Sequence, residues 1–145
     1  MNTFSLGIDL HGTIDSDPEL FLKFLTYCTK YLNINVYIIS GPPTEQIKKE
    51  LSALNLYHIQ HYKHIISVVD FIKDQNIKMT QDKNGNWWTD HRIWWSTKAQ
   101  ICTVFNIDVL VDDKIEYKEY FTKWMKCKFI LWNSEKLKLV KELIK

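Results

Sequence analysis

The stretch "LGIDLHGTID", residues 6–15, decides the fold that we predict for this chain. An apolar run ends in the carboxylate of Asp9, and the short segment after it contains Gly12 and Thr13. A brief apolar run that ends in this way is typical of a buried strand, here residues 3–9, in a parallel sheet. Ligands bind at the carboxyl ends of the strands in open α/β sheets, so a site is expected just after Asp9.

Outward from this stretch, apolar strands alternate with segments of helical periodicity. Asp17 and Pro18 are typical of a helix start, and Gly-Pro-Pro at 41–43 separates a β-branched strand from the next helix. The predicted strands cover residues 3–9, 35–40, 56–62, 108–113 and 127–132. The predicted helices cover residues 18–32, 44–54, 64–75, 96–105, 115–124 and 134–145. The alternation predicts one Rossmann-like α/β domain over residues 1–145, with a mostly parallel sheet and helices on both faces.

Residues 78–95 interrupt this pattern. "DKNGN" at 82–86 is typical of a hairpin turn, so we predict a small antiparallel hairpin or flap inserted here. Four of the six tryptophans fall in this region, namely Trp87, Trp88, Trp94 and Trp95. They can form an aromatic platform for a nucleobase or another flat group, or they can pack a small satellite core under the hairpin. The general tendency of large aromatic side chains to pack in cores favours the second interpretation.

The composition is that of an ordinary globular protein. The 145 residues are 46% hydrophobic and 25% charged, and one domain of this length can bury a core. A formal net charge of +2 and a single arginine among 19 basic residues give no argument for a polyanionic partner. No apolar run approaches the roughly 18 residues of a membrane span, and no signal peptide is recognisable. Three cysteines without CxxC spacing favour neither disulfides nor zinc, so a reducing, cytoplasmic setting is expected.

Polar side chains gather at the ends of the predicted strands. They are Asp9, His11 and Thr13 after the first strand, Ser40 and Gly41 after the second, Lys98 in the first turn of the helix before the fourth, and Asp112 and Asp113 after the fourth. Three carboxylates repel one another, and a hard divalent cation such as Mg²⁺ relieves this repulsion by taking oxygen ligands. A hydroxyl, backbone N–H groups and a lysine ammonium can hold phosphate oxygens. The sequence therefore predicts a site for phosphate and Mg²⁺.

The order of these segments resembles the haloacid dehalogenase (HAD) superfamily of phosphohydrolases. The first motif of that family is an apolar strand followed by DxDGT or DxDGV, and the others are a strand ending in Ser or Thr, a lone lysine at a helix start, and a strand ending in paired acids. The matching residues here are Asp9-Leu10-His11-Gly12-Thr13, Ser40 with Gly41, Lys98, and Asp112 with Asp113. Four motifs in the same order, within residues 4–113, make the resemblance fairly specific.

The resemblance implies a role for each matching residue. Asp9 would be the nucleophile that forms an aspartyl-phosphate, with Lys98 beside it in the catalytic set. Mg²⁺ would be bound by Asp9, the backbone carbonyl of His11, Asp112 and Asp113. The phosphate would be bound by Thr13, Ser40, Gly41 and Lys98.

His11 departs from the motif, because the family normally has an aspartate there that protonates the leaving oxygen and then activates water. Imidazole has a pKa near 6.5 and exchanges protons near neutrality, and a nearby phosphate would raise that pKa. His11 therefore either takes over the proton transfer or only hydrogen-bonds the phosphate or a neighbouring acid. The frequency of histidine in acid–base catalysis favours the first interpretation.

These observations predict a Mg²⁺-dependent phosphatase that hydrolyses a phosphate monoester. Only the segment 78–95 remains for a cap, and by resemblance capless members tend to act on large substrates. The expected substrate is a nucleotide, a nucleic-acid end or a phosphoprotein. Two alternatives stay open: a catalytically impaired protein that binds phosphate and Mg²⁺, and a scaffold that recruits a partner through its tryptophans.

Overall fold

The apolar run before Asp9 forms β1 (Ser5–Ile8), whose four residues are all buried. The computed structural model describes residues 3–136. The elements after β1 are η1 (Ile14–Ser16), α1 (Pro18–Lys30), β2 (Asn35–Ser40), α2 (Thr44–Ala53), β3 (His64–Ser67), α3 (Val68–Asp74), β4 (Thr80–Gln81), β5 (Trp87–Trp88), α4 (His91–Val104), β6 (Val109–Asp112), η2 (Ile115–Tyr120) and β7 (Lys128–Leu131), where η denotes a 3₁₀ helix. As predicted, Pro18 opens α1, and the Asp17 carboxylate caps it by accepting a hydrogen bond from Leu20 N at 3.2 Å.

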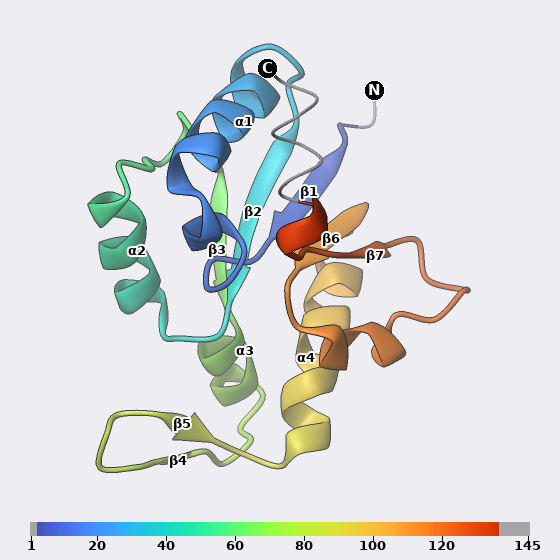
Figure 1. Cartoon of the computed structure of the whole chain (residues 1–145). Helices are drawn as coiled ribbons and strands as arrows, with labels where there is room; N and C mark the ends of the chain where they lie inside the picture. Colours follow the sequence, from blue (N-terminus) through green and yellow to red (C-terminus); the bar gives the residue numbers. More distant parts are fainter. Residues whose placement is uncertain (1–2, 137–145) are drawn as a thin grey trace.

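Five strands form one parallel sheet in the order β3-β2-β1-β6-β7 (Figure 1). The strand order reverses beside β1: the chain runs from β1 to β2 and β3 on one side, and returns to β6 and β7 on the other. Ile8 is paired with Ile38 of β2 and with Val111 of β6. Ligands of open α/β sheets bind in the crevice where the strand order reverses, which is called the switch point. A ligand site is therefore expected at the carboxyl ends of β1 and β6.

Helices cover both faces of the sheet. Alternate residues of each strand point to opposite sides, so neighbouring residues of one strand pack against different helices. Ile38 of β2 packs with α1 and α2, whereas its neighbour Ile39 packs with α3 and α4. The Rossmann-like α/β fold predicted from the sequence is confirmed.

The prediction for the third strand is wrong. A strand was expected at 56–62 and a helix at 64–75, but β3 begins at His64 and α3 begins at Val68. Ser67 sets this boundary, since its hydroxyl accepts a hydrogen bond from Asp70 N at 3.0 Å and caps α3. Ile59, in the middle of the strand expected at 56–62, has a φ of 74°, a left-handed value that an extended strand does not allow.

The helix that carries Lys98 begins at His91, earlier than the predicted start near Ser96. The Asp90 carboxylate accepts a hydrogen bond from Arg92 N at 2.8 Å and caps the helix there. Lys98 therefore lies inside α4, and the prediction that it occupies the first turn is wrong.

The prediction of an α-helix at 115–124 is also wrong, because the segment forms the shorter 3₁₀ helix η2. Tyr117 is the one buried residue of η2, so the segment lacks the apolar face whose burial stabilises most α-helices in proteins. The helix predicted at 134–145 falls mostly on residues 137–145, outside the described part of the chain.

The predicted hairpin is present as β4 and β5, which pair antiparallel through Thr80 with Trp88 and Gln81 with Trp87. Figure 1 shows it beyond the carboxyl end of β2. The insert is shorter than the predicted 78–95, since α4 takes up its last residues. Within residues 3–136, no helix combines the length and the apolar composition needed to cross a membrane.

Candidate active site

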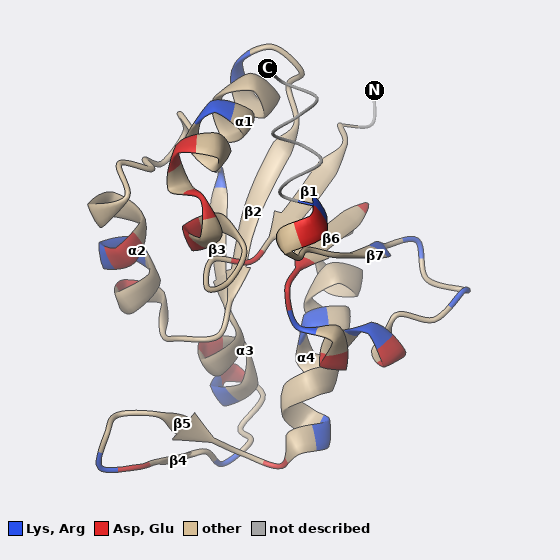
Figure 2. Ribbon diagram, in the orientation of Figure 1, with Lys and Arg blue, Asp and Glu red and all other residues tan. Residues whose placement is uncertain are grey.

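Three carboxylates meet where the strand order reverses. Asp9 follows β1, Asp112 is the last residue of β6, and Asp113 follows it. The Asp9 amide donates a hydrogen bond to Val111 O at 3.0 Å, which continues the pairing of β1 with β6 and holds Asp9 beside Asp112. Figure 2 shows the acidic ends of β1 and β6 next to the basic segment of α4. The residues that the sequence placed at these two strand ends are thus brought together.

Lys98 reaches this point from α4. Its Nζ lies 3.0 Å from Asp9 Oδ1, and it also donates a hydrogen bond to Asp112 Oδ2. The side chain is only 2% exposed, and a lysine this deeply buried is tolerated because two carboxylates surround it. The aromatic ring of Tyr117 covers the ammonium at 4.5 Å from its centroid.

Burial changes the protonation of these groups. It raises the pKa of Asp9 to about 7, an effect that the ammonium of Lys98 opposes and the charge of Asp112 reinforces. Burial alone would lower the pKa of Lys98, but the charges of Asp9 and Asp112 outweigh it and hold the pKa above its ordinary value. Lys98 is therefore a permanent cation in the site.

The carboxylates of Asp9, Asp112 and Asp113 fit a divalent cation. One oxygen from each lies within 4.8 Å of the others, and Lys98 alone cannot balance three negative charges. Asp113 Oδ1 is buried and has no hydrogen-bond partner among the described residues. An all-oxygen donor set of this kind suits a hard divalent cation.

Gly12 allows Asp113 to approach the loop after β1. Its φ is +82°, and a Cβ at this position would lie 2.0 Å from Asp113 Oδ2. Any other residue would displace the carboxylate or strain the backbone.

Two buried hydroxyls belong to the segments that the sequence assigned to the same site, one in the loop after β1 and one at the end of β2. Thr13 Oγ1 and Ser40 Oγ are buried without a hydrogen-bond partner among residues 3–136. An unsatisfied buried hydroxyl costs about 1–3 kcal/mol, so each of these two groups calls for a partner that accepts its hydrogen bond. Gly41 follows Ser40 at the end of β2, as the sequence predicted.

His11 lies outside the buried carboxylate cluster. Its side chain is 47% exposed, and Nε2 is hydrogen-bonded to Glu50 Oε2 of α2. Glu50 and Tyr117 were not predicted from the sequence. Both belong to other elements than the residues they contact, so only the folded chain reveals them.

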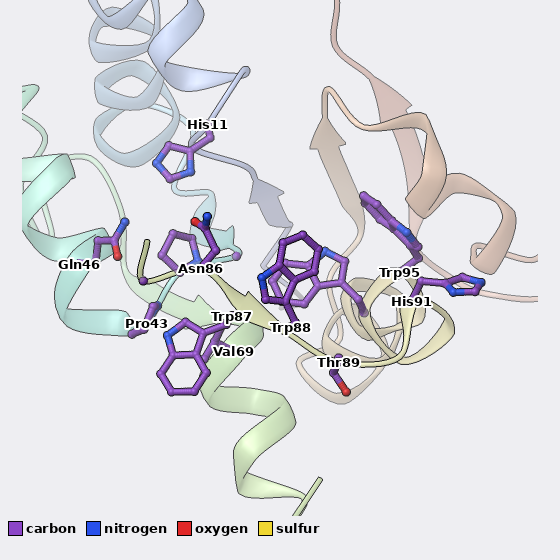
Figure 3. A pocket seen from close by; sticks show the side chains of 14 residues that line it. His11, Pro43, Gln46, Val69, Asn86, Trp87, Trp88, Thr89, His91 and Trp95 are labelled. Carbon is purple, nitrogen blue, oxygen red and sulfur yellow. The ribbon is translucent and has the colours of Figure 1, made fainter. Parts of the chain in front are cut away.

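The four tryptophans of region 78–95 do not form a closed satellite core. They line a pocket of about 490 Å³ together with His11 and Gly41 (Figure 3). Trp88 is 58% exposed. We call this cavity the aromatic pocket.

Comparison with known proteins supports the fold and identifies no family. No protein-family model matches the chain, and no curated protein matches it either. The structure is similar to the crystal structure of an uncharacterized protein from Corynebacterium glutamicum, with a TM-score of 0.57 and 12% sequence identity over 98% of this chain and 93% of that chain. At this identity the likeness concerns the fold alone.

Proposed function

We propose that this chain is a Mg²⁺-dependent phosphatase that hydrolyses a phosphate monoester with Asp9 as the nucleophile. The observation that carries the proposal is the buried cluster of Asp9, Asp112 and Lys98 at the switch point, with Asp113 beside it. The unpaired oxygens of Asp113, Thr13 and Ser40 support it. The motif order that resembles the HAD superfamily supports the same assignment.

The chemistry proceeds in two displacements at phosphorus. A carboxylate oxygen of Asp9 attacks, the bond between phosphorus and the ester oxygen breaks, and the leaving oxygen takes a proton from His11. Water then gives a proton to His11 and attacks the aspartyl-phosphate, which releases inorganic phosphate and restores the carboxylate. No oxidant or reductant is required.

The phosphate is held by the groups around Asp9. Lys98, the hydroxyls of Thr13 and Ser40 and the backbone N–H at Gly41 provide donors for its oxygens. Asp9, Asp112, Asp113 and the backbone carbonyl of His11 would hold Mg²⁺, which supplies neutralisation of the phosphate charge when bound. Without that neutralisation, the carboxylates would repel the phosphate dianion.

Hydrolysis of p-nitrophenyl phosphate tests the proposal. The Asp9→Asn variant is expected to lose at least about 10³-fold in turnover with Mg²⁺ present, because the amide is a poor nucleophile. Asp74→Asn, which makes the same change at an exposed position of α3, is the matched control and should retain wild-type turnover.

A specific observation favours a second candidate function. The ring of His11 is engaged by Glu50 rather than by the carboxylate cluster, as expected of a protein that binds phosphate and Mg²⁺ without turnover. Mg²⁺ binding without hydrolysis of any phosphate ester in a broad panel would replace the phosphatase by this alternative. A partner that binds through the tryptophans and independently of Asp9 would instead establish a scaffold.

A further inference from the structure

We propose that the aromatic pocket binds the base of a nucleoside monophosphate whose phosphate sits at Asp9. This inference rests on the proposed function and names its substrate. The pocket is lined by segments from the loop after β1, the start of α2, the hairpin and α4, and Figure 3 shows His11, Asn86 and Trp88 among them.

The aromatic pocket shares two chain segments with the proposed phosphate site, although Asp9, Ser40 and Lys98 themselves do not line it. His11 lies two residues after Asp9, and Gly41 follows Ser40, yet both residues line the pocket. One ligand can therefore place its phosphate at the carboxyl end of β1 and its remainder against the hairpin.

Each of the four indole rings makes a contact within the folded chain that restrains it, and a restrained ring loses less entropy on binding. These contacts are the hydrogen bond from Trp88 Nε1 to Asp82 Oδ2 at 3.0 Å, Lys73 Nζ at 3.4 Å from the ring centroid of Trp87, the edge-to-face packing of Trp95 on Tyr117 at 4.8 Å, and the close approach of Trp94 to Gly41.

The chemistry of the lining selects a neutral, flat group with polar edges. None of the residues that line the pocket is a lysine, arginine, aspartate or glutamate, so the charged part of the ligand belongs at Asp9 and Lys98. The indoles offer stacking surfaces, and the side chains of Gln46, Asn86 and Thr89 provide hydrogen-bonding groups. A volume of about 490 Å³ is within the range of small-ligand pockets. A nucleobase combines a flat apolar face with amide-like edges, and it fits this set better than a plain phenyl ring.

The experiment compares phosphate esters that carry different groups on the ester oxygen. The probes are adenosine 5′-monophosphate, uridine 5′-monophosphate, ribose 5-phosphate and phenyl phosphate. Their kcat/KM values with Mg²⁺ are expected to be at least about tenfold higher for the better nucleotide than for ribose 5-phosphate, because a stacked base contributes about that much affinity. Trp88→Ala should lower this ratio about tenfold, and Trp124→Ala, which removes an indole that is 83% exposed and outside the pocket, should leave it unchanged.

Binding measured with Asp9→Asn separates this inference from the proposed function. Quenching of tryptophan fluorescence by the same four probes needs no turnover, so it tests the pocket even if no ester is hydrolysed. Tighter binding of a nucleotide than of ribose 5-phosphate, reduced by Trp88→Ala, supports the inference. Equal binding of both probes, or a preference for phenyl phosphate over both nucleotides, overturns it whatever the outcome for catalysis.

Discussion

Lys98 offsets part of the buried negative charge of the site. Its ammonium contacts Asp9 and Asp112, and it opposes, without cancelling, the rise in pKa that burial causes in both carboxyl groups. A lone lysine in a sequence is usually solvated, so the residue type of Lys98 does not by itself predict a buried contact with two carboxylates. Only its place in the motif order indicated it.

His11 is the residue on which turnover depends in the proposed mechanism. His11→Ala should lower kcat about 100-fold for an alkyl phosphate, whose leaving oxygen needs a proton, and less for p-nitrophenyl phosphate, whose phenolate leaves without one. His11→Asp restores the residue found in the family motif and should keep or improve turnover. Steady-state kinetics on both esters measures this difference.

A substitution of Glu50 tests the role of His11 indirectly. Glu50 contacts the His11 ring and, in the proposed mechanism, positions it. Glu50→Gln should lower turnover less than His11→Ala does, because it leaves the imidazole in place. Equal turnover of wild type, His11→Ala and His11→Asp on the alkyl ester would show that the histidine transfers no proton.

Strands are predicted most reliably from short apolar runs bounded by polar residues, and the run predicted at 127–132, observed as Lys128–Leu131, shows that no site residue is needed at the strand end. The runs before Asp9, Ser40 and Asp112 were placed to within two residues at each end, because a short β-branched or apolar run followed by a polar loop has one interpretation. The run "HIISVV" at 64–69 has two interpretations, since apolar residues suit either a strand or a buried helix. The capping bond of Ser67 decides between them, and its partner Asp70 was not recognised as a cap signal.

Asp108 joins three strands and gives a prediction about stability. Its Oδ2 accepts a hydrogen bond from Ser5 N of β1 at 2.8 Å, and its Oδ1 lies 3.0 Å from Lys126 Nζ, just before β7. Partial burial raises the pKa of Asp108, but the Ser5 amide and the Lys126 ammonium outweigh it and hold the pKa below its ordinary value of 3.8. Asp108→Asn should therefore lower the free energy of unfolding at pH 7 by about 1 kcal/mol.

The pH dependence of this effect follows from the sign of the shift. A depressed pKa in the folded state stabilises the protein above the unfolded-state pKa, and the contribution is lost as the pH falls through the folded-state value. The difference between wild type and Asp108→Asn should be full at pH 7 and shrink below about pH 4 in denaturant titrations. A difference that stays constant down to pH 2 would contradict this account. Asp74→Asn serves as the exposed control.

At the scale of the whole molecule, the sequence predicted which residues meet but not what surrounds them. Motif order together with a parallel sheet is enough to bring Asp9, Asp112 and Lys98 into one cluster, because strand ends share an edge. The pairing of His11 with Glu50 and the opening of the aromatic pocket depend on how α2 and the hairpin pack. Side-chain periodicity carries no information about such packing, so both features emerge only from the folded chain.

Because the carboxylates come from two strands that are distant in sequence, a bound cation should stabilise the whole fold. Saturating Mg²⁺ at about 100 times its Kd should raise the melting temperature by roughly 5–10 °C, since the unfolded chain lacks the assembled ligands. EDTA should reverse the shift, and Asp113→Asn should abolish most of it, whereas Asp74→Asn should respond like the wild type. Differential scanning calorimetry measures these shifts without any substrate. An equal Mg²⁺ response in Asp113→Asn and wild type would place the cation elsewhere, and the mechanism built on Asp9 would lose its metal.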